Sequence, residues 1–373
     1  MFQHLPEWRL PHRILCIRLD GLGDVLMTSP ALTAIKETHP NSHLALLTSS
    51  AGAAVAKLIP CIDEVLVYDA PWLKATAKRE NSQPDLAWIA KLRDRQFNAA
   101  IIFTVYSQNP LPSAMMAYLA DIPLRLAHCR ENPYQLLTHH IPESEPQVTI
   151  RHEAQRQLDL VASIGCTTTN PQLRISFSET DRKKIEQHLQ TTMLSKRSPW
   201  IVIHPGASAA SRRYPAEQFV QAANLLIEQG ITPIFTGITS EIPLVESIRS
   251  KLKGRSHSLA GQIDLPEMAA LLSSAPLLLS NNTGPVHIAA ATRTPTVVLY
   301  ALTNIQHTPW RVPNRVLYHD VPCRLCYKSI CPEGHQHCLS LVEPEQVVTA
   351  VLDLLQEQSH LFNEQSTFAL VKA

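Results

Sequence analysis

The chain has 373 residues, which at roughly 150 residues per domain predicts two domains. Its 33 Lys and Arg residues nearly balance its 32 Asp and Glu residues, and the isoelectric point is about 7.7. This balance argues against a nucleic-acid-coating protein, because such proteins usually have isoelectric points above about 9. A hydrophobic content of 45% with 17% charged residues excludes a disordered chain.

The sequence shows no sign of membrane insertion or secretion. No apolar run approaches the roughly 18 residues that a transmembrane helix needs. Residues 1–13 lack the apolar centre of a secretory signal. We therefore expect a cytoplasmic protein, with the scattered cysteines as reduced thiols in the core. These scattered cysteines are Cys16, Cys61, Cys129 and Cys166.

The first half of the chain alternates short apolar runs with helical segments. Residues 13–19 form a nearly continuous apolar run that predicts a strand, and residues 27–37 predict the helix that follows. Further elements are expected as strands at 43–47, 64–68 and 99–104 and as a basic helix at 151–164. Runs that are apolar throughout indicate strands covered on both faces, as in a parallel sheet flanked by helices.

The second half repeats this pattern after a polar stretch at 166–198 that contains a charged helix at 179–194. Strands are expected at 200–203, 232–235, 276–279 and 296–299, and helices at 215–228, 242–252, 266–272, 285–291 and 342–356. Two successive βαβ halves predict an α/β protein with two facing, doubly wound, Rossmann-like domains. We expect the domains to span 1–175 and 176–356, a loose tail at 357–373, and a ligand site between the domains.

The first candidate site is the glycine turn RLDGLGD at residues 18–24, between a strand and a helix. Gly21 and Gly23 permit a tight turn and a close approach of a ligand to the backbone. The spacing does not complete a dinucleotide-binding G-x-G-x-x-G motif. Asp24 is interpreted as a helix N-cap, as a carboxylate that accepts a proton, or as both. Asp20, in the same turn, is the second candidate for a base.

The second candidate site is HPGAS at residues 204–208 with SRRYP at 211–215. Small residues expose backbone N–H groups, and the guanidinium of Arg212 or Arg213 can bind a phosphate through two hydrogen bonds. The alternative is an ordinary surface loop with solvated arginines.

The third candidate site lies in SNNTGPVHIAAA at residues 280–291. Asn282 or Thr283 is placed to cap a helix, with Gly284 and Pro285 in its first turn. A helix that begins where a strand ends can bind an anion with its free N–H groups, although simple capping explains the same pattern. His287 is expected to be packed or hydrogen-bonded within this helix.

The fourth cluster contains the cysteines Cys323, Cys326, Cys331 and Cys338. Four thiols in a reduced compartment suggest a structural zinc site, but the spacing matches no standard zinc framework. Packed thiols, or a loop stapled under oxidation, are the alternatives.

These motifs, in this order, resemble the heptosyltransferase family, glycosyltransferase family 9. The resemblance rests on RLDGLGDVLMTSPAL, IVIHPGASAASRRYPAEQF, residues 237–241, LAGQIDLPEMAALLSSA and SNNTGPVHIAAATRTPTVVLY, and on the cysteine-bearing segment that ends in EPEQVVTAVLDLL. It implies a GT-B fold and an inverting transfer of heptose from ADP-heptose to a lipid-A-linked Kdo or a core heptose of lipopolysaccharide. The donor would bind the second domain and the acceptor the first.

The resemblance also assigns roles to single residues. Asp24 matches the family's general base, and Arg212 stands where members often have a lysine that contacts the donor diphosphate. Thr283 and Gly284 match a phosphate-binding segment, in which Asn282 replaces the usual aspartate. The donor-binding set that we expect also contains Gly23, His204, Gly206, Ser208, Arg213, Gly237, Glu241 and His287.

No Asp-x-Asp motif is present to hold a metal at the diphosphate, so no cofactor is expected beyond the nucleotide-sugar substrate. The expected partners are the nucleotide-sugar and a lipid-linked oligosaccharide acceptor. Trp8, Trp72 and residues 74–79 offer an aromatic and basic edge for the inner membrane, or form a solvated loop. The alternative functions are a nucleotide-sugar epimerase or hydrolase of the same fold, and a non-catalytic sugar-nucleotide-binding protein.

Overall fold

The computed structural model describes residue 8 and residues 12–73, 76–192 and 199–370. The chain divides into two compact units, Met1–Ser176 and Phe177–Ala373, and each is described here by itself. Among the described residues, no helix is both long and apolar enough to cross a membrane.

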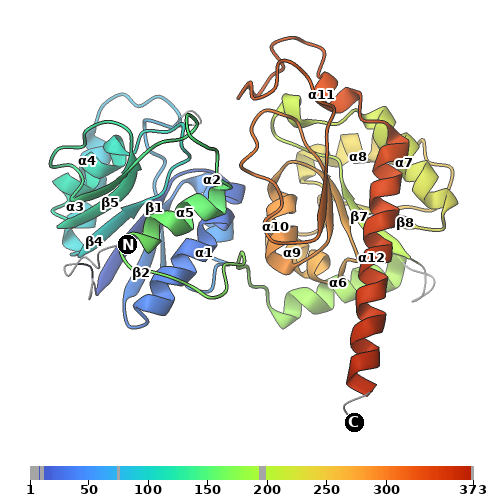
Figure 1. Cartoon of the computed structure of the whole chain (residues 1–373), viewed down its shortest axis with the longest axis horizontal. Coiled ribbons are helices and arrows are strands. Elements are labelled where there is room, and N and C mark those ends of the chain that lie inside the picture. Colours follow the sequence, from blue (N-terminus) through green and yellow to red (C-terminus); the bar gives the residue numbers. More distant parts are fainter. Residues whose placement is uncertain (1–7, 9–11, 74–75, 193–198, 371–373) are drawn as a thin grey trace. The chain divides into compact units, whose positions relative to one another are not determined.

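Unit 1 is a parallel sheet with the strand order β3-β2-β1-β4-β5-β6, flanked by helices (Figure 1). Its strands are β1 (Arg13–Arg18), β2 (His43–Thr48), β3 (Glu64–Val67), β4 (Ala99–Ile102), β5 (Leu124–Cys129) and β6 (His139–Pro142). Its helices are α1 (Leu22–Thr38), α2 (Ser50–Ala56), α3 (Gln83–Asp94), α4 (Leu111–Leu119) and α5 (Glu153–Ala162). The chain builds outward from β1 to β3 and then from β4 to β6. The order therefore reverses between β1 and β4, which is where such sheets bind ligands.

Unit 2 repeats this design with the order β12-β11-β10-β7-β8-β9. Its strands are β7 (Trp200–His204), β8 (Thr232–Phe235), β9 (His257–Ser258), β10 (Leu278–Asn281), β11 (Thr296–Leu299) and β12 (Asn314–Leu317). Its helices are α6 (Glu179–Thr192), α7 (Ala216–Glu228), α8 (Ile242–Arg249), α9 (Leu265–Ser274), α10 (Gly284–Thr292), α11 (His337–Ser340) and α12 (Pro344–Leu370), with 3₁₀ turns η2 (Ala210–Arg212) and η3 (Thr239–Glu241). The strand order reverses between β7 and β10, so the loops after these two strands meet at one edge of the sheet.

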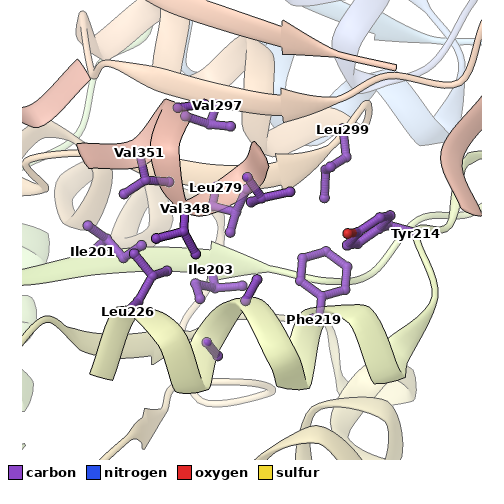
Figure 2. Close-up of a cluster of buried hydrophobic side chains, with 14 of the residues drawn as sticks. Ile201, Ile203, Tyr214, Phe219, Leu226, Leu279, Val297, Leu299, Val348 and Val351 are labelled. Atoms are coloured by element: carbon purple, nitrogen blue, oxygen red, sulfur yellow. The ribbon is translucent and has the colours of Figure 1, made fainter. Parts of the chain in front are cut away.

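The core of unit 2 lies between one face of the sheet and helices α7 and α12 (Figure 2). Ile203 and Leu279 of the sheet face Phe219 of α7, and all three side chains are fully buried. The Tyr214 ring meets the Phe219 ring edge-on, and its hydroxyl donates a hydrogen bond to the Val342 carbonyl at 2.7 Å. Burial of each such side chain contributes about 1.5–3 kcal/mol, so the loop that ends at Tyr214 is anchored in the core.

The structure corrects three expectations from the sequence. Helix α1 begins at Leu22, and Gly21 is its N-cap, so Asp24 lies in the first helical turn and does not cap the helix. Strands β5, β6, β9 and β12 were not expected from the sequence. The segment expected as a loose tail is helical, because α12 continues to Leu370. Residues 357–370 contain no Pro or Gly that would end the helix.

Candidate functional site

A buried arginine organises the carboxyl end of β1. The side chain of Arg18 is fully buried, and its guanidinium contacts three carboxylates. The distances are 2.8 Å from Nε to Asp20 Oδ2, 3.3 Å from Nη2 to Asp24 Oδ1 and 2.7 Å from Nη1 to Glu153 Oε1. Glu153 also accepts a hydrogen bond from Gln157 Nε2 at 2.6 Å. One buried cation thus holds the turn at 18–24 against helix α5.

The two aspartates of this turn differ in availability. One carboxylate oxygen of Asp20 contacts the Arg18 guanidinium, and the other accepts a 2.6 Å hydrogen bond from Gln108 Nε2. Burial, together with the nearby Asp24 and Glu153 carboxylates, raises the pKa of Asp20, although Arg18 opposes that shift. The Asp24 side chain is 26% exposed against 15% for Asp20, and it makes the longer contact with Arg18. Asp24 is therefore the carboxylate with more room for a substrate.

In unit 2, the loop after β7 is built around a neutral histidine. His204 Nδ1 shares a 3.0 Å hydrogen bond with Thr236 Oγ1, and burial lowers the pKa of His204 to about 4. At neutral pH the ring is therefore uncharged, and its 3.7 Å approach to Glu241 Oε2 is not a true ion pair. Glu241 Oε2 also accepts a 2.9 Å hydrogen bond from the Ile238 amide.

Gly206 makes room for this carboxylate. A Cβ atom added at Gly206 would lie 2.0 Å from Glu241 Oε1, which is an impossible contact. A Cβ at Gly237 would lie 3.1 Å from the Cβ of Glu241. The structure therefore brings His204, Gly206, Gly237 and Glu241 together at the carboxyl ends of β7 and β8.

Asn281, the last residue of β10, ties this loop to the next one. Its Nδ2 donates to the Pro205 carbonyl at 2.7 Å, and its Oδ1 accepts from the Tyr214 amide at 3.0 Å. Both ends of the segment 205–214 are thereby fixed beside the start of α10. Sequence reasoning did not single out Asn281, although it precedes the expected helix cap by one residue.

Arg212 and Asn282 both influence a buried tyrosine, Tyr300, that the sequence analysis missed. Burial raises the pKa of Tyr300, while the Arg212 guanidinium and a hydrogen bond with the Asn282 side chain oppose that shift. In the described part of the chain, Arg212 forms no ion pair with a carboxylate. Asn282 is 2% exposed, so its side-chain amide is shielded from solvent beside Tyr300.

The N-terminus of α10 lies next to Asn282. Thr283 is the N-cap residue, but its side chain does not cap the helix. The N–H groups of a first helical turn have no partners within the helix and attract anions. A half-buried cation, an amide donor and an uncapped helix end thus lie around Tyr300, which is a set suited to phosphate.

The remaining predicted residues are placed less centrally. Arg213 is exposed, and its Nε donates a hydrogen bond to the Ala207 carbonyl at 2.8 Å, which stabilises the loop. Ser208 is also exposed. His287 is buried within α10, with its ring 6.5 Å from that of His307. Gly23 lies in the first turn of α1 in unit 1, whereas the other donor candidates are in unit 2.

The four clustered cysteines are free thiols that line one small cavity of about 20 Å³ together with His335. Across the residues that the structure describes, no group of three or more His, Cys, Asp or Glu side chains is arranged to hold a metal ion. The structure therefore does not form the zinc site that their clustering suggested. The other cysteines are also free: Cys16, Cys129 and Cys166 are buried, and Cys61 is partly buried.

The predicted aromatic and basic edge is wrong in one part. Trp8 is 1% exposed, and its Nε1 donates to His139 Nδ1 at 3.0 Å, so it is not available to a membrane. Trp72 is 38% exposed, and Arg79 pairs with Asp85. Residues 74–75 of the predicted basic segment lie outside the described residues.

Residues 86–337, more than half of the chain, match the family model for glycosyltransferase family 9 (heptosyltransferase). The chain belongs to this glycosyltransferase family. The match includes the loops of unit 2 that were described above, and it begins after the Arg18–Asp24 turn.

Named relatives and solved structures agree with this family 9 assignment. Lipooligosaccharide heptosyltransferase 2 of Campylobacter jejuni is 24% identical over 95% of this chain and 98% of its own length. The family 9 glycosyltransferase of Veillonella parvula superposes with a TM-score of 0.75 at 22% identity, over 93% of this chain and 97% of that one. The E. coli heptosyltransferase WaaC, solved with ADP-2-deoxy-2-fluoro heptose, gives a TM-score of 0.64 at 19% identity, over 93% of this chain and 99% of that chain. These similarities, with the two parallel sheets, show the GT-B fold that the sequence predicted.

Proposed function

We propose that this family 9 enzyme transfers heptose, with inversion, from ADP-heptose to a core sugar of lipopolysaccharide at the cytoplasmic face of the inner membrane. The names of its relative and of the WaaC complex support the donor and the class of acceptor. The observation that carries the proposal is the anion-binding set of unit 2. Arg212, the Asn282 amide and the N-terminus of α10 lie near Tyr300, and among the described residues no carboxylate pairs with Arg212.

In the proposed reaction, Asp24 is the general base. An acceptor hydroxyl gives its proton to the Asp24 carboxylate while its oxygen forms a bond to the anomeric carbon of the heptose. The bond from that carbon to the diphosphate oxygen breaks on the opposite face, and ADP leaves with the electron pair. The acceptor would bind unit 1, as the resemblance implies. Asp24 is preferred over Asp20 because its side chain is more exposed and lies farther from the Arg18 guanidinium.

The role of unit 2 is to stabilise the leaving group. Negative charge develops on the diphosphate in the transition state, and preorganised donors are most effective where that charge appears. Arg212 supplies a full positive charge, and Thr283 and Gly284 supply N–H groups at the helix N-terminus. Asn282 fits this task better than the usual aspartate would, because its amide donates a hydrogen bond and carries no negative charge.

The test pairs one variant in each unit. Asp24→Asn should lower kcat by about 10²–10⁴-fold, the range of a positioned base, and leave the Kd for ADP unchanged by calorimetry. Arg212→Ala should weaken ADP binding at least tenfold and also lower kcat. Arg249→Ala, which removes a partly buried arginine of α8 paired with Glu246, is the matched control and should change neither.

The assay also separates the alternative functions. Release of ADP from the donor should require an acceptor, because the attacking oxygen belongs to the acceptor. ADP release without an acceptor would indicate a hydrolase, and nucleotide-sugar binding without turnover on any acceptor would indicate a binding protein. Full activity of Asp24→Asn would move the base elsewhere.

A further inference from the structure

Unit 1 contains a cavity of about 290 Å³ beside the Asp20–Asp24 turn. It lies where β1 and β4 end, which is the point at which the strand order of this sheet reverses. Its lining comes from the ends of these strands, the loop after β3 and the start of α4. The lining residues are Ile17, Leu19, Asp20, Trp72, Leu73, Phe103, Thr104, Gln108, Asn109, Pro112 and Ser113.

The size of the cavity limits its occupant. Small-molecule sites usually measure roughly 300–1,000 Å³, so this one is at the small end of the range. One sugar ring suits this volume better than a nucleotide or an oligosaccharide does. The lining also combines apolar surfaces with hydrogen-bonding groups, and a sugar ring needs both. Leu19, Phe103 and Trp72 offer apolar surfaces for its C–H faces, and amide and carboxylate groups offer partners for its hydroxyls.

A buried hydroxyl in this lining lacks a partner. Thr104 is 8% exposed, and in the described part of the chain its Oγ1 has no hydrogen-bond partner. The Thr104 carbonyl, by contrast, accepts hydrogen bonds from Arg156 and Gln157. An unsatisfied buried hydroxyl costs about 1–3 kcal/mol. Because Oγ1 is closed off from solvent in this rotamer, a ligand hydroxyl recovers that cost only when the Thr104 side chain turns toward the cavity.

The charge of the cavity selects an uncharged occupant. Asp20 contributes a carboxylate, and none of the lining residues, all within the described ranges, is Lys, Arg or His. The nearby Arg18 is fully buried and already shared among three carboxylates. A second anion would therefore meet an excess of negative charge at short range.

We infer that this cavity holds the terminal ring of the acceptor, and that this ring is an uncharged polyol and not a sugar acid. The inference rests on the proposed function for the identity of the reaction. Because Arg18 contacts both Asp20 and Asp24, a ring against Asp20 lies next to the proposed base. Of the two acceptor sugars that the resemblance implies, a core heptose fits this site, and Kdo, which carries a carboxylate, does not.

The test compares two purified core acceptors, one ending in heptose and one ending in Kdo, with ADP-heptose as donor. The wild-type enzyme should use the heptose-ended acceptor with at least tenfold higher kcat/KM. Thr104→Val should raise the acceptor KM about 2–10-fold, the range of one lost hydrogen bond, without changing the donor KM or the unfolding temperature. Trp72→Ala, at a 38% exposed position, should raise the acceptor KM by at least as much.

Thr48→Val is the matched control. Thr48 ends β2 in the same unit, and its buried Oγ1 also lacks a partner among the described residues, but it does not line the cavity. This variant should leave the acceptor KM unchanged. If Thr104→Val and Trp72→Ala also leave it unchanged, or if the Kdo-ended acceptor is used equally well, the inference is wrong.

A binding experiment separates this inference from the proposed function. Ligand-observed NMR of the full chain with the methyl glycoside of heptose, without donor, should show binding that Trp72→Ala abolishes. If the wild-type enzyme transfers to neither acceptor but still binds this glycoside through Trp72, the proposed function fails and the sugar site stands. If the glycoside does not bind to the wild-type chain, the sugar site fails whatever the activity.

Discussion

Glu153→Gln tests whether the buried cluster around Arg18 controls both the stability of unit 1 and the proposed base. The Glu153 side chain is 1% exposed, and its Oε1 accepts hydrogen bonds from Arg18 and Gln157. Removal of one partner of a buried pair costs about 3–5 kcal/mol. Glutamine keeps an acceptor oxygen, and Arg18 keeps both aspartates. We therefore expect the free energy of unfolding to decrease by about 1.5–3 kcal/mol, the value of one hydrogen bond to a charged group.

The same substitution should move the pH dependence in a defined direction. The Glu153 charge is one of the causes that raise the pKa of Asp20. Its removal leaves Arg18 shared between two carboxylates, so their ionised forms are favoured. The acid limb of the pH profile of kcat should therefore move to lower pH, while the midpoint of urea unfolding decreases.

Glu143→Gln is the matched control for this prediction. Glu143 is 4% exposed and pairs with Arg156 in the same unit, so its loss should also destabilise the fold. Because it does not contact Arg18, it should leave the acid limb in place. The reasoning is refuted if Glu153→Gln leaves the limb unmoved, or if both variants shift it equally.

Two further predictions concern unit 2. Gly206→Ala should weaken ADP binding at least tenfold by calorimetry, because the new Cβ displaces Glu241; wild-type affinity would show that the loop adapts freely. The free energy of unfolding should decrease as the pH drops below 6.5, the ordinary pKa of histidine, and the decrease should level off near pH 4. The reason is that His204 binds a proton in the unfolded chain over this range but stays neutral while it is buried in the folded chain. His204→Gln should flatten this slope in urea titrations at several pH values, and an unchanged slope would assign it to other groups.

Strand β5 was missed because its sequence is not apolar throughout. Strand β5 contains Arg125, which is 7% exposed, so its pattern is not that of a buried strand. Arg125 is tolerated there because its guanidinium donates to main-chain carbonyls, including those of Leu136 and Gln135, both at 2.8 Å. Such hydrogen bonds form only in the folded chain and leave no pattern in the sequence.

The candidate site was predictable to the extent that it is local in sequence. Asp20 and Asp24 lie within six residues of Arg18, and the strand-turn-helix pattern indicated their position. Glu153 is 135 residues from Arg18, and nothing in its own helix marks it as a partner. Tyr300 was missed for the same reason, because its link to Arg212 and Asn282 arises only when β10 and β11 pair.

The loop that carries Arg212 is held from a distant part of the chain. The amide and hydroxyl of Ser211 donate to the carbonyls of Ser329 and Lys328 at 3.1 and 2.9 Å, and Gln336 Nε2 donates to the Ala210 carbonyl at 2.9 Å. Between β12 and α11 the chain forms neither helix nor strand, so these bonds tie an irregular segment to the 3₁₀ turn η2. Residues more than 100 positions away in the sequence therefore hold the main chain that carries Arg212. Natural variation in the cysteine-bearing segment should consequently tune donor affinity while the residues around Tyr300 stay the same.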